Sequence, residues 1–362
     1  MSTINGRNIY KKLENEGYDA AVFFDEINQR YLTGFHSTDG IVLVDERETA
    51  LIVDSRYYEA AVLAKSNGLL QEDVTPYLLS NRAMDSLIDH MEKKSISSLA
   101  FDKTILTVAQ AERLERALPK HKIGGLSDIC GTQRQIKSKA EIKSIKAAQE
   151  ITDAAFSHIL SFIREGVTET EVAAELEYFC RRSGADGMAF NTIAVSGANS
   201  SLPHGVPSKI PLTKNSFFTM DYGAKYNGYC SDMTRTVVLG RADSEMRHVY
   251  ETVLTAQRKS LETVKSGVTG IEVDFAARNY IYASGYEGFF GHSTGHSLGL
   301  EIHEQPRFST ASGEKVMAGA VMTVEPGIYL PGRYGVRIED LVLITKSGCK
   351  NFTRSSKELI EL

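Results

Sequence analysis

The chain contains no tryptophan, only four cysteines and only eight prolines among its 362 residues. The cysteines stand far apart without a CxxC pair, and we interpret them as reduced thiols rather than as a disulfide framework. No apolar run approaches the roughly 20 residues that cross a bilayer, so we expect no membrane partner. The formal net charge of −5 gives no sign of a nucleic-acid partner. The first residues lack the apolar stretch of a signal peptide, and we expect a cytoplasmic protein.

The sequence does contain a small α/β pattern followed by a longer mixed one. The predicted strands are 20–24, 41–44, 50–53 and 98–101, and the predicted helices are 57–65, 82–93 and 107–118. The glycines of 124–128 indicate a turn near the end of this pattern. A long amphipathic helix, opened by a capping-box pattern, is predicted over 138–163. We therefore expect two domains, 1–132 and 133–362.

An internal repeat at an offset of 101 residues runs through the C-terminal part. Arg164-Glu-Gly-Val-Thr-Glu-Thr-Glu-Val172 resembles Lys265-Ser-Gly-Val-Thr-Gly-Ile-Glu-Val273, and Gly184 matches Gly285. Each copy predicts a helix end, a tight turn and a second helix that ends at glycine. Strands carrying two acids follow each copy. We infer two halves that are related by pseudo-symmetry.

Two acids in a predicted hairpin, Asp221 and Asp232, stand where strand residues are expected, on either side of a tip at Tyr226-Asn-Gly-Tyr229. Aspartate is depleted in strands, and a buried carboxylate is costly unless it is paired or bound to a metal. The second half supplies Glu325 and Glu339. Four carboxylates at one centre cannot all ionise without compensation, and two divalent cations would cancel their charge. The sequence therefore predicts a dinuclear metal site.

Histidines lie between the two pairs of acids: His204 comes first, and His292, His296 and His303 follow in one glycine-rich stretch. Ligation by oxygen atoms and one imidazole suits Mn²⁺, Co²⁺, Fe²⁺ or Zn²⁺ without choosing among them. Two such ions would lower the pKa of a shared water from about 15.7 towards 7 and make it a nucleophile. The glycines do not form the GxxxxGK[ST] pattern of a phosphate loop. The composition of the site therefore favours hydrolysis.

Four segments together resemble the pita-bread metallopeptidases, and within them the aminopeptidase P and prolidase branch. The segments are Asp221-Tyr-Gly with Gly228-Tyr-Cys-Ser-Asp-Met-Thr-Arg-Thr236, His292-Ser-Thr-Gly-His-Ser-Leu-Gly-Leu-Glu-Ile-His-Glu304, Val324-Glu-Pro-Gly-Ile-Tyr329 and Val336-Arg-Ile-Glu-Asp340. Tyr31-Leu-Thr-Gly-Phe35 adds a resemblance to the creatinase-like N-terminal domain. The resemblance covers nearly the whole chain. It implies an α/β creatinase-like domain, an α+β pita-bread catalytic domain with pseudo-twofold halves, and a homodimer.

Carried over position by position, the resemblance implies a set of five metal ligands. They are Asp221, Asp232, His296, Glu325 and Glu339. Asp232 and Glu339 would bridge two divalent ions, with manganese first and cobalt, zinc or iron as alternatives. Glu325 would also pass a proton to the leaving amine. All five positions are filled in the order that the family pattern requires.

The same resemblance gives four further residues a place in catalysis. His204 would lie near the substrate and the intermediate, and His292 would hold the substrate near its scissile end. His303 would stabilise the tetrahedral intermediate. Arg337 would lie behind the carboxylate ligands, although the residues alone leave open a plain pairing of Arg337 with Asp340.

The activity that the resemblance implies is a metallo-exopeptidase acting on Xaa-Pro bonds in proline-containing peptides. We expect an Xaa-Pro aminopeptidase first, and keep as the alternative a prolidase (Xaa-Pro dipeptidase) restricted to dipeptides. The segment Phe35-His-Ser-Thr-Asp39 is a candidate for closing the site after the proline. Methionine aminopeptidase usually lacks the N-terminal domain. A metal-free creatinase-type amidinohydrolase or a non-catalytic pita-bread binding protein would have lost ligands that this chain retains.

Overall fold

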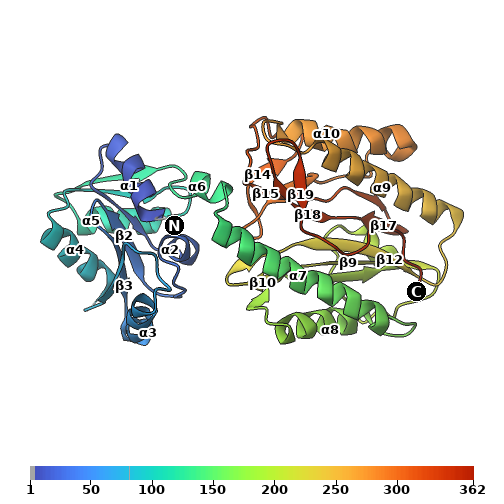
Figure 1. Cartoon of the computed structure of the whole chain (residues 1–362), viewed down its shortest axis with the longest axis horizontal. Helices are drawn as coiled ribbons and strands as arrows, with labels where there is room; N and C mark the ends of the chain where they lie inside the picture. Colours follow the sequence, from blue (N-terminus) through green and yellow to red (C-terminus); the bar gives the residue numbers. More distant parts are fainter. Residues whose placement is uncertain (1–4, 81) are drawn as a thin grey trace. The chain divides into compact units, whose positions relative to one another are not determined.

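The computed structural model describes residues 5–80 and 82–362, which form two compact units, one as far as Gln133 and one from Arg134 onward. Residues 1–4 and 81, which the predicted domain 1–132 includes, lie outside the described residues. In Figure 1 the N-terminal unit is coloured blue to cyan and the C-terminal unit green to red. Among the described residues, every helix is too short or too polar to cross a bilayer.

The N-terminal unit is a six-stranded mixed sheet with helices packed around it. The strand order is β4-β3-β2-β1-β5-β6, in which β1–β2 and β2–β3 are antiparallel and the other neighbours are parallel. Strands β1, β2, β3 and β5 are buried along their whole length, which explains their mostly apolar sequences. The elements are α1 Asn5–Asn15, β1 Ala20–Phe23, α2 Glu26–Thr33, β2 Ile41–Asp45, β3 Thr49–Val53, α3 Ser55–Ser66, β4 Val74–Leu78, α4 Ala83–Lys94, β5 Ser98–Asp102, α5 Val108–Ala117 and β6 Lys122–Leu126, with α6 Gly131–Gln135 at the division.

The sequence predicts β1, β2, β3, β5 and helices α3 to α5 to within two residues, and it does not predict α1, α2, β4 or β6. The predicted turn at 124–128 is wrong in its first half, because Gly124 and Gly125 lie in β6, paired with β5. These glycines make room for packing: a Cβ on Gly124 would lie 1.9 Å from the Tyr18 hydroxyl oxygen, and one on Gly125 would lie 3.1 Å from the Phe101 ring. Glycine inside a strand marks such a close approach as well as a turn.

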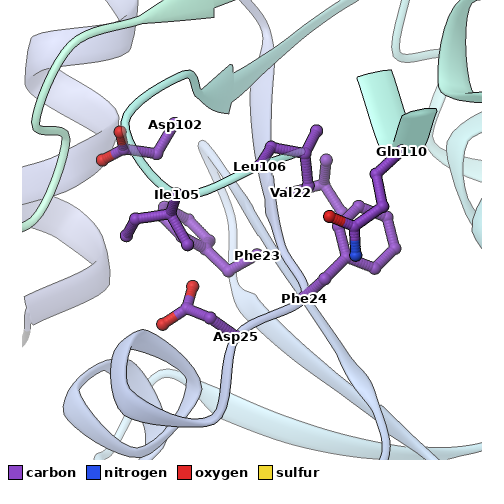
Figure 2. Close-up of a pocket in the computed structure, with 8 residues that line it drawn as sticks. All are labelled: Val22, Phe23, Phe24, Asp25, Asp102, Ile105, Leu106 and Gln110. Carbon is purple, nitrogen blue, oxygen red and sulfur yellow. The ribbon is translucent and has the colours of Figure 1, made fainter. Parts of the chain in front are cut away.

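A cavity of about 100 Å³ lies where the parallel neighbours β1 and β5 end (Figure 2). Two acids stand on its lining. Asp25 caps α2 by accepting the Asn28 backbone N–H at 2.7 Å, and Asp102 accepts the Ile129 backbone N–H at 2.7 Å. Both carboxylates therefore accept backbone hydrogen bonds that stabilise the fold, which accounts for their presence at the ends of these strands.

The C-terminal unit holds its strands between long helices, with α7 and α8 on one side and α9 and α10 on the other (Figure 1). The sheets are β12-β9-β8, β14-β13-β15-β18-β19, β11-β10-β7 and β16-β17. The helical elements are α7 Lys139–Phe162, α8 Glu169–Arg182, the 3-10 turn Gly197–Ser201, α9 Ser244–Thr263, α10 Gly270–Ile281 and a π turn Tyr282–Tyr286. The strands are β7 Gly187–Met188, β8 Ile193–Ser196, β9 Ser216–Tyr222, β10 Ala224–Tyr226, β11 Tyr229–Cys230, β12 Met233–Leu239, β13 Gly295–Ser297, β14 Glu304–Phe308, β15 Val321–Val324, β16 Gly327–Leu330, β17 Tyr334–Arg337, β18 Asp340–Ile344 and β19 Cys349–Asn351.

The repeat in the sequence corresponds to two matching helical corners. Between α7 and α8 the chain turns at Gly166, with a φ of 86°, and between α9 and α10 it turns at Gly267, with a φ of 93°. Thr168 caps α8 and Thr269 caps α10, each in a capping box with the glutamate three residues later. The same local chemistry at the same offset therefore builds the same corner in both halves.

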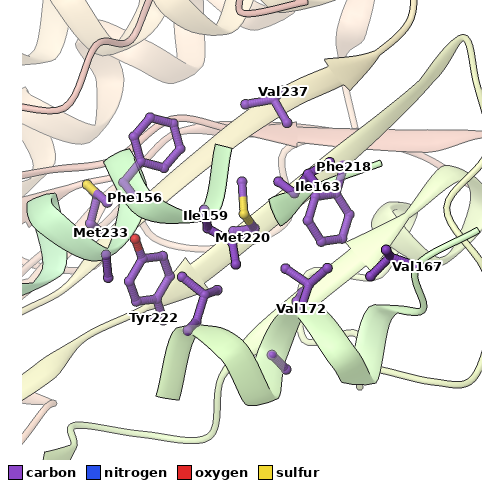
Figure 3. Close-up of a cluster of buried hydrophobic side chains, with 14 of the residues drawn as sticks. Phe156, Ile159, Ile163, Val167, Val172, Phe218, Met220, Tyr222, Met233 and Val237 are labelled. Carbon is purple, nitrogen blue, oxygen red and sulfur yellow. The ribbon is translucent and has the colours of Figure 1, made fainter. Parts of the chain in front are cut away.

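A buried apolar cluster packs β9 against the helices α7 and α8. Figure 3 shows Phe156 and Ile159 of α7 packed with Phe218 and Met220 of β9. Because successive strand residues point to opposite faces of a sheet, the residue after Met220 points away from this core. That residue is Asp221, and the packing of its neighbours thereby directs its carboxylate to the other face.

Candidate metal centre and active site

The two aspartates come from the hairpin formed by β9 and β12. Asp221 lies in β9 opposite Thr234, and Asp232 directly precedes β12. At the tip, Asn227 and Gly228 have φ values of 50° and 78°, as in the two-residue turn that an Asn-Gly pair favours. The hairpin therefore holds both carboxylates on neighbouring strands at a fixed register.

The second pair of acids stands at the ends of two other antiparallel strands. Glu325 directly follows β15 and Glu339 directly precedes β18, so the register of these strands sets the two glutamates opposite each other. His296 lies on β13, the neighbour of β15. Its Nε2 atom is 3.4 Å from Glu325 Oε1 and 3.5 Å from Asp232 Oδ2. One imidazole and carboxylates from both halves thus meet at one centre.

Three buried carboxylate oxygens at this centre have no hydrogen-bond partner within residues 5–80 and 82–362: Asp221 Oδ1, Asp232 Oδ1 and Glu339 Oε1. The other oxygen of Glu339 accepts from the Thr234 hydroxyl at 2.8 Å. Buried polar atoms without partners are rare in proteins, and such atoms call for an ion or a water. Because the unpartnered atoms here are all carboxylate oxygens, a cation fits them.

The histidine of the centre also leaves one atom available. His296 Nδ1 hydrogen-bonds to the Ser297 carbonyl oxygen at 3.1 Å, which makes Nδ1 the protonated nitrogen and Nε2 an acceptor. Single atoms from Asp232, His296 and Glu339 lie within 4.8 Å of one another. This set of oxygen and nitrogen donors suits a divalent first-row metal ion.

Electrostatics point the same way. Burial, followed by the neighbouring carboxylates, raises the pKa of Asp232 and Glu339 well above the usual range. Burial also raises the pKa of Glu325 to about 7, against the opposing effect of Arg337. Burial lowers the pKa of His296 to about 3, so its ring is neutral at neutral pH. Divalent cations would replace the protons that these carboxylates otherwise take up.

Comparison with known proteins adds the family. The model of metallopeptidase family M24 matches residues 143–346, and that of the creatinase/prolidase N-terminal domain matches residues 7–136. This chain belongs to metallopeptidase family M24. As an M24 enzyme it is a metallo-exopeptidase, and the family depends on two divalent metal ions.

Relatives of this M24 enzyme are similar along their whole length. The chain is 37% identical to a Pyrococcus horikoshii protein named Xaa-Pro dipeptidase, with 98% of each chain covered. It superposes on the solved structure of an Xaa-Pro dipeptidase from Bacillus anthracis with a TM-score of 0.93 and 39% identity, and on that of an X-Pro aminopeptidase from Thermotoga maritima with a TM-score of 0.91 and 35% identity. Both superpositions cover 99% of each chain. These likenesses confirm the predicted creatinase-like and pita-bread folds.

A cavity of about 610 Å³ opens onto the M24 centre. Its lining contains all nine residues predicted to bind metal or to act in catalysis: Asp221, Asp232, His296, Glu325, Glu339, His204, His292, His303 and Arg337. His204 and His303 are exposed to the cavity, and the His303 ring stands edge-on to the His296 ring at 4.5 Å between centroids. The structure thus brings all nine residues together, and their individual roles stay predictions.

Arg337 pairs with a predicted ligand and not with the residue that the sequence left open as a partner. Its Nη2 atom donates to Asp221 Oδ2 at 2.6 Å, whereas Asp340 pairs with Arg235 at 2.8 Å. A further donation from Arg337 Nη1 reaches the Pro203 carbonyl oxygen at 3.1 Å. Arg337 therefore links a carboxylate of the centre to the loop that carries His204.

Tyr329 completes this arrangement, although the sequence analysis did not single it out. Its hydroxyl accepts from Arg337 Nη1 at 2.6 Å and hydrogen-bonds to His292 Nε2 at 2.8 Å. The other ring nitrogen of His292, Nδ1, bonds to the Ser293 carbonyl oxygen at 2.8 Å. Both nitrogens of His292 thus have protein partners, which holds the ring in place beside the cavity.

Arg307 is a second cavity residue that the sequence does not predict. It lies on β14 opposite His296, lines the cavity, and forms no ion pair within the described part of the chain. The alternation of residues along β14 could have indicated this position. Gln305 and Arg307 lie on the exposed face of the strand, whereas Glu304 and Phe308 lie on its buried face. Arg307 therefore places a cation in the cavity wall beside the centre, where its charge also acts on Glu325.

Proposed function

We propose that this M24 enzyme is an Xaa-Pro dipeptidase, which splits a dipeptide before its C-terminal proline. The observation that carries the proposal is Arg307, a cation of the cavity wall that forms no ion pair with any described residue. A dipeptide differs from a longer peptide by a free carboxylate on its proline, and a guanidinium binds a carboxylate through two parallel hydrogen bonds. The names of the relatives from P. horikoshii and B. anthracis support the same reading.

This proposal reverses the order expected from the sequence, in which an aminopeptidase stood first. The Xaa-Pro aminopeptidase remains the second candidate, because the T. maritima structure bearing that name has a TM-score of 0.91. The two activities share the same centre and differ in what lies beyond the proline. The length of peptide that is cleaved separates them.

We propose that Asp221, Asp232, His296, Glu325 and Glu339 hold two divalent ions, manganese first, with cobalt, zinc or iron as alternatives. When bound, such ions polarise the scissile carbonyl and lower the pKa of water so that it is a nucleophile near neutral pH. The two positive charges on each ion balance the four carboxylates.

Proton transfer in the proposed reaction falls to Glu325. Its Oε1 atom accepts from the Thr323 hydroxyl at 3.0 Å, which fixes the carboxylate at the cavity wall. The nitrogen of a leaving proline has no N–H of its own in the peptide, so it must gain a proton to leave as an amine. Glu325 is the ligand that delivers this proton in the proposal.

Histidines stabilise the charge that develops on the carbonyl oxygen in this mechanism. His303 and His204 have exposed rings in the cavity, where an imidazole N–H can donate to that oxygen. The Arg337 bond to the Pro203 carbonyl holds the loop that presents His204. The apolar side chains of Phe190 and Ile302 line the same cavity and would pack against the proline ring.

Substrate length tests the proposal. We expect the manganese-loaded enzyme to hydrolyse Ala-Pro with a kcat/KM about 10–100-fold above that for Ala-Pro-amide, because a charge-assisted hydrogen bond contributes about 1.5–3 kcal/mol. Arg307→Gln should remove most of this difference by slowing Ala-Pro alone, and Arg307→Lys should keep part of it. Efficient cleavage of Ala-Pro-Ala by the unmodified enzyme would overturn the dipeptidase reading in favour of the aminopeptidase.

A cytoplasmic homodimer is a further part of the proposal, which rests on the sequence and on the family resemblance. Light scattering of the purified chain checks the dimer, with a mass of twice 39.9 kDa expected. A monomeric mass in active enzyme would contradict it.

A further inference from the structure

We propose that the N-terminal unit binds a structural metal ion of the zinc class between Asp45, Glu48 and His90. One ligand atom from each of these side chains lies within 4.8 Å of the other two. The site lies wholly within the N-terminal unit and shares no residue with the lining of the M24 cavity. It therefore goes beyond the peptidase centre and does not depend on the proposed dipeptidase activity.

A tight hairpin and one helix bring the three side chains together. Asp45 ends β2 and Glu48 directly precedes β3, so the two acids flank the turn between these strands. Asp45 Oδ1 accepts the backbone N–H groups of Arg47 and Glu48 at 2.7 and 3.0 Å, which fixes the orientation of its carboxylate. His90 comes from α4, and its ring stands edge-on to the Tyr77 ring at 4.8 Å between centroids.

Two atoms of this cluster are buried and have no hydrogen-bond partner among the described residues: Asp45 Oδ2 and His90 Nε2. Their residues are only 8% and 7% exposed. His90 Nε2 is 3.7 Å from Glu48 Oε1, which is too long for a hydrogen bond. Unpaired buried atoms of this kind call for a bound ion or water. Ligand atoms about 2.0–2.2 Å from a tetrahedral zinc ion stand roughly 3.3–3.6 Å apart, close to the 3.7 Å between His90 Nε2 and Glu48 Oε1.

Lys94 pairs with the Glu48 carboxylate and would therefore compete with a metal ion for it. Its Nζ atom lies 2.8 Å from Glu48 Oε1, and the Tyr77 hydroxyl donates to the same oxygen at 2.8 Å. Lys94 is the last residue of α4, and its side chain is 24% exposed, so its ammonium group can turn to solvent. Two carboxylates would then balance a divalent ion, and the Tyr77 hydroxyl or a water would complete four-coordination.

The donor set selects the class of ion. One imidazole and two carboxylates match the nitrogen and oxygen ligands of zinc, and the usual order of affinities places zinc above manganese. A cavity of about 140 Å³ is lined by Asp45 and Lys94, so one ligand of the cluster and its competing lysine border an open space. Bound there, the ion would tie the β2–β3 turn to α4 and stabilise the N-terminal unit by mass action.

Metal content and anomalous scattering test the site on the full chain. After loading with zinc and removal of the free ion, we expect three zinc ions per chain and an anomalous peak between Asp45 and His90. The variants His90→Gln and Asp45→Asn should each hold one ion fewer and keep their manganese-supported peptidase activity. His36→Gln, which replaces an exposed histidine of the same unit, is the matched control and should keep all three. Lys94→Met should bind the third ion about tenfold more tightly, since it removes a competing charge.

Two results would overturn the inference. One is an anomalous map of the zinc-loaded wild-type chain without a peak at this cluster, a measurement that needs no variant and so does not depend on how well the variants fold. The other is equal zinc content in the wild type, His90→Gln and Asp45→Asn. Either result would assign the space to water or to Lys94.

Discussion

Arg337 donates to Asp221 across 2.6 Å, and the two side chains are 4% and 13% exposed. This bond occupies Asp221 Oδ2, so the remaining oxygen, Oδ1, is the one left for a cation. Thr234 plays the same part at the opposite strand, since its hydroxyl occupies one oxygen of Glu339 and accepts from Arg337 Nε. These two hydrogen bonds thus leave one oxygen of Asp221 and one of Glu339 available for a cation.

Replacing Arg337 by methionine should lower both metal affinity and kcat/KM by about 10–100-fold, the usual effect of losing a partner that orients a metal ligand. Metal content after dialysis and kcat/KM on Ala-Pro are the measurements. Arg333→Met is the matched control, because Arg333 pairs with Glu245 on the surface, where both are half exposed. Wild-type metal content and activity in Arg337→Met would contradict the assigned role.

The buried pair of Arg235 and Asp340 should matter more for stability. Both side chains are 1% exposed, and Arg235 also donates to the Glu339 carbonyl oxygen. Arg235→Met should lower the free energy of unfolding by about 3 kcal/mol, because it removes one partner of a buried ion pair while Lys357 still pairs with Asp340. Arg258→Met, which breaks an exposed pair with Glu358, should cost less than about 1 kcal/mol. Urea denaturation of the metal-loaded chain compares them, and equal losses would refute the distinction.

Truncation of the apolar cluster under β9 provides a test of the core. Phe218 is 1% exposed, and Phe218→Ala should cost about 3–5 kcal/mol through lost burial and the resulting cavity. Phe275→Ala removes the same atoms from a side chain that is 43% exposed on α10 and should cost far less. Thermal and urea unfolding of both variants are the measurements. A similar loss in both would mean that the cluster does not hold β9.

The stability of the metal-free enzyme should fall as the pH rises. Burial raises the folded-state pKa of Asp232 and Glu339 well above the usual range and that of Glu325 to about 7. A carboxylate with a raised folded-state pKa stabilises the folded protein fully at a pH below its unfolded-state pKa of about 4. This stabilisation is lost as the pH rises through the folded-state pKa. We expect the Tm of chelator-treated enzyme to drop between about pH 5 and pH 8.

The metal-loaded enzyme is the control for that titration. Cations replace the protons on the carboxylates, so its Tm should hold or rise over the same interval. Glu339→Gln should show a shallower fall without metal, because it removes one of the carboxylates that titrate. Parallel curves with and without metal would show that the cluster does not control the pH dependence.

The sequence could predict which carboxylates come together because they sit in local patterns. The Asn-Gly tip set the hairpin of Asp221 and Asp232, and the repeat gave that pair its counterparts Glu325 and Glu339. The capping box that opens α7 at Ser138 was predictable for the same reason, because a helix N-terminus is a short-range feature. The segments that resemble the family then placed the five candidate ligands in sequence order. The comparisons confirm the family and the fold.

Long-range contacts were beyond the sequence. Arg337 had an acidic neighbour in Asp340, but strand register, which depends on tertiary packing, gave it Asp221 as partner. Tyr329 is linked to His292 across 37 positions in the chain, and no spacing rule announces such a bond. The glycines of β6 favour a turn in the sequence, because the Tyr18 side chain that excludes a larger residue at Gly124 lies far away along the chain.

The matching corners at Gly166 and Gly267 have a consequence for how the catalytic unit holds together. Each half brings two carboxylates to the centre, so neither half alone has enough negative charge for two divalent ions. Two ions held by all four carboxylates would join the halves, and part of the free energy of metal binding would become free energy of association between them. If the chain is divided in the loop before α9 and the two halves are expressed separately, we expect them to associate only above a threshold metal concentration.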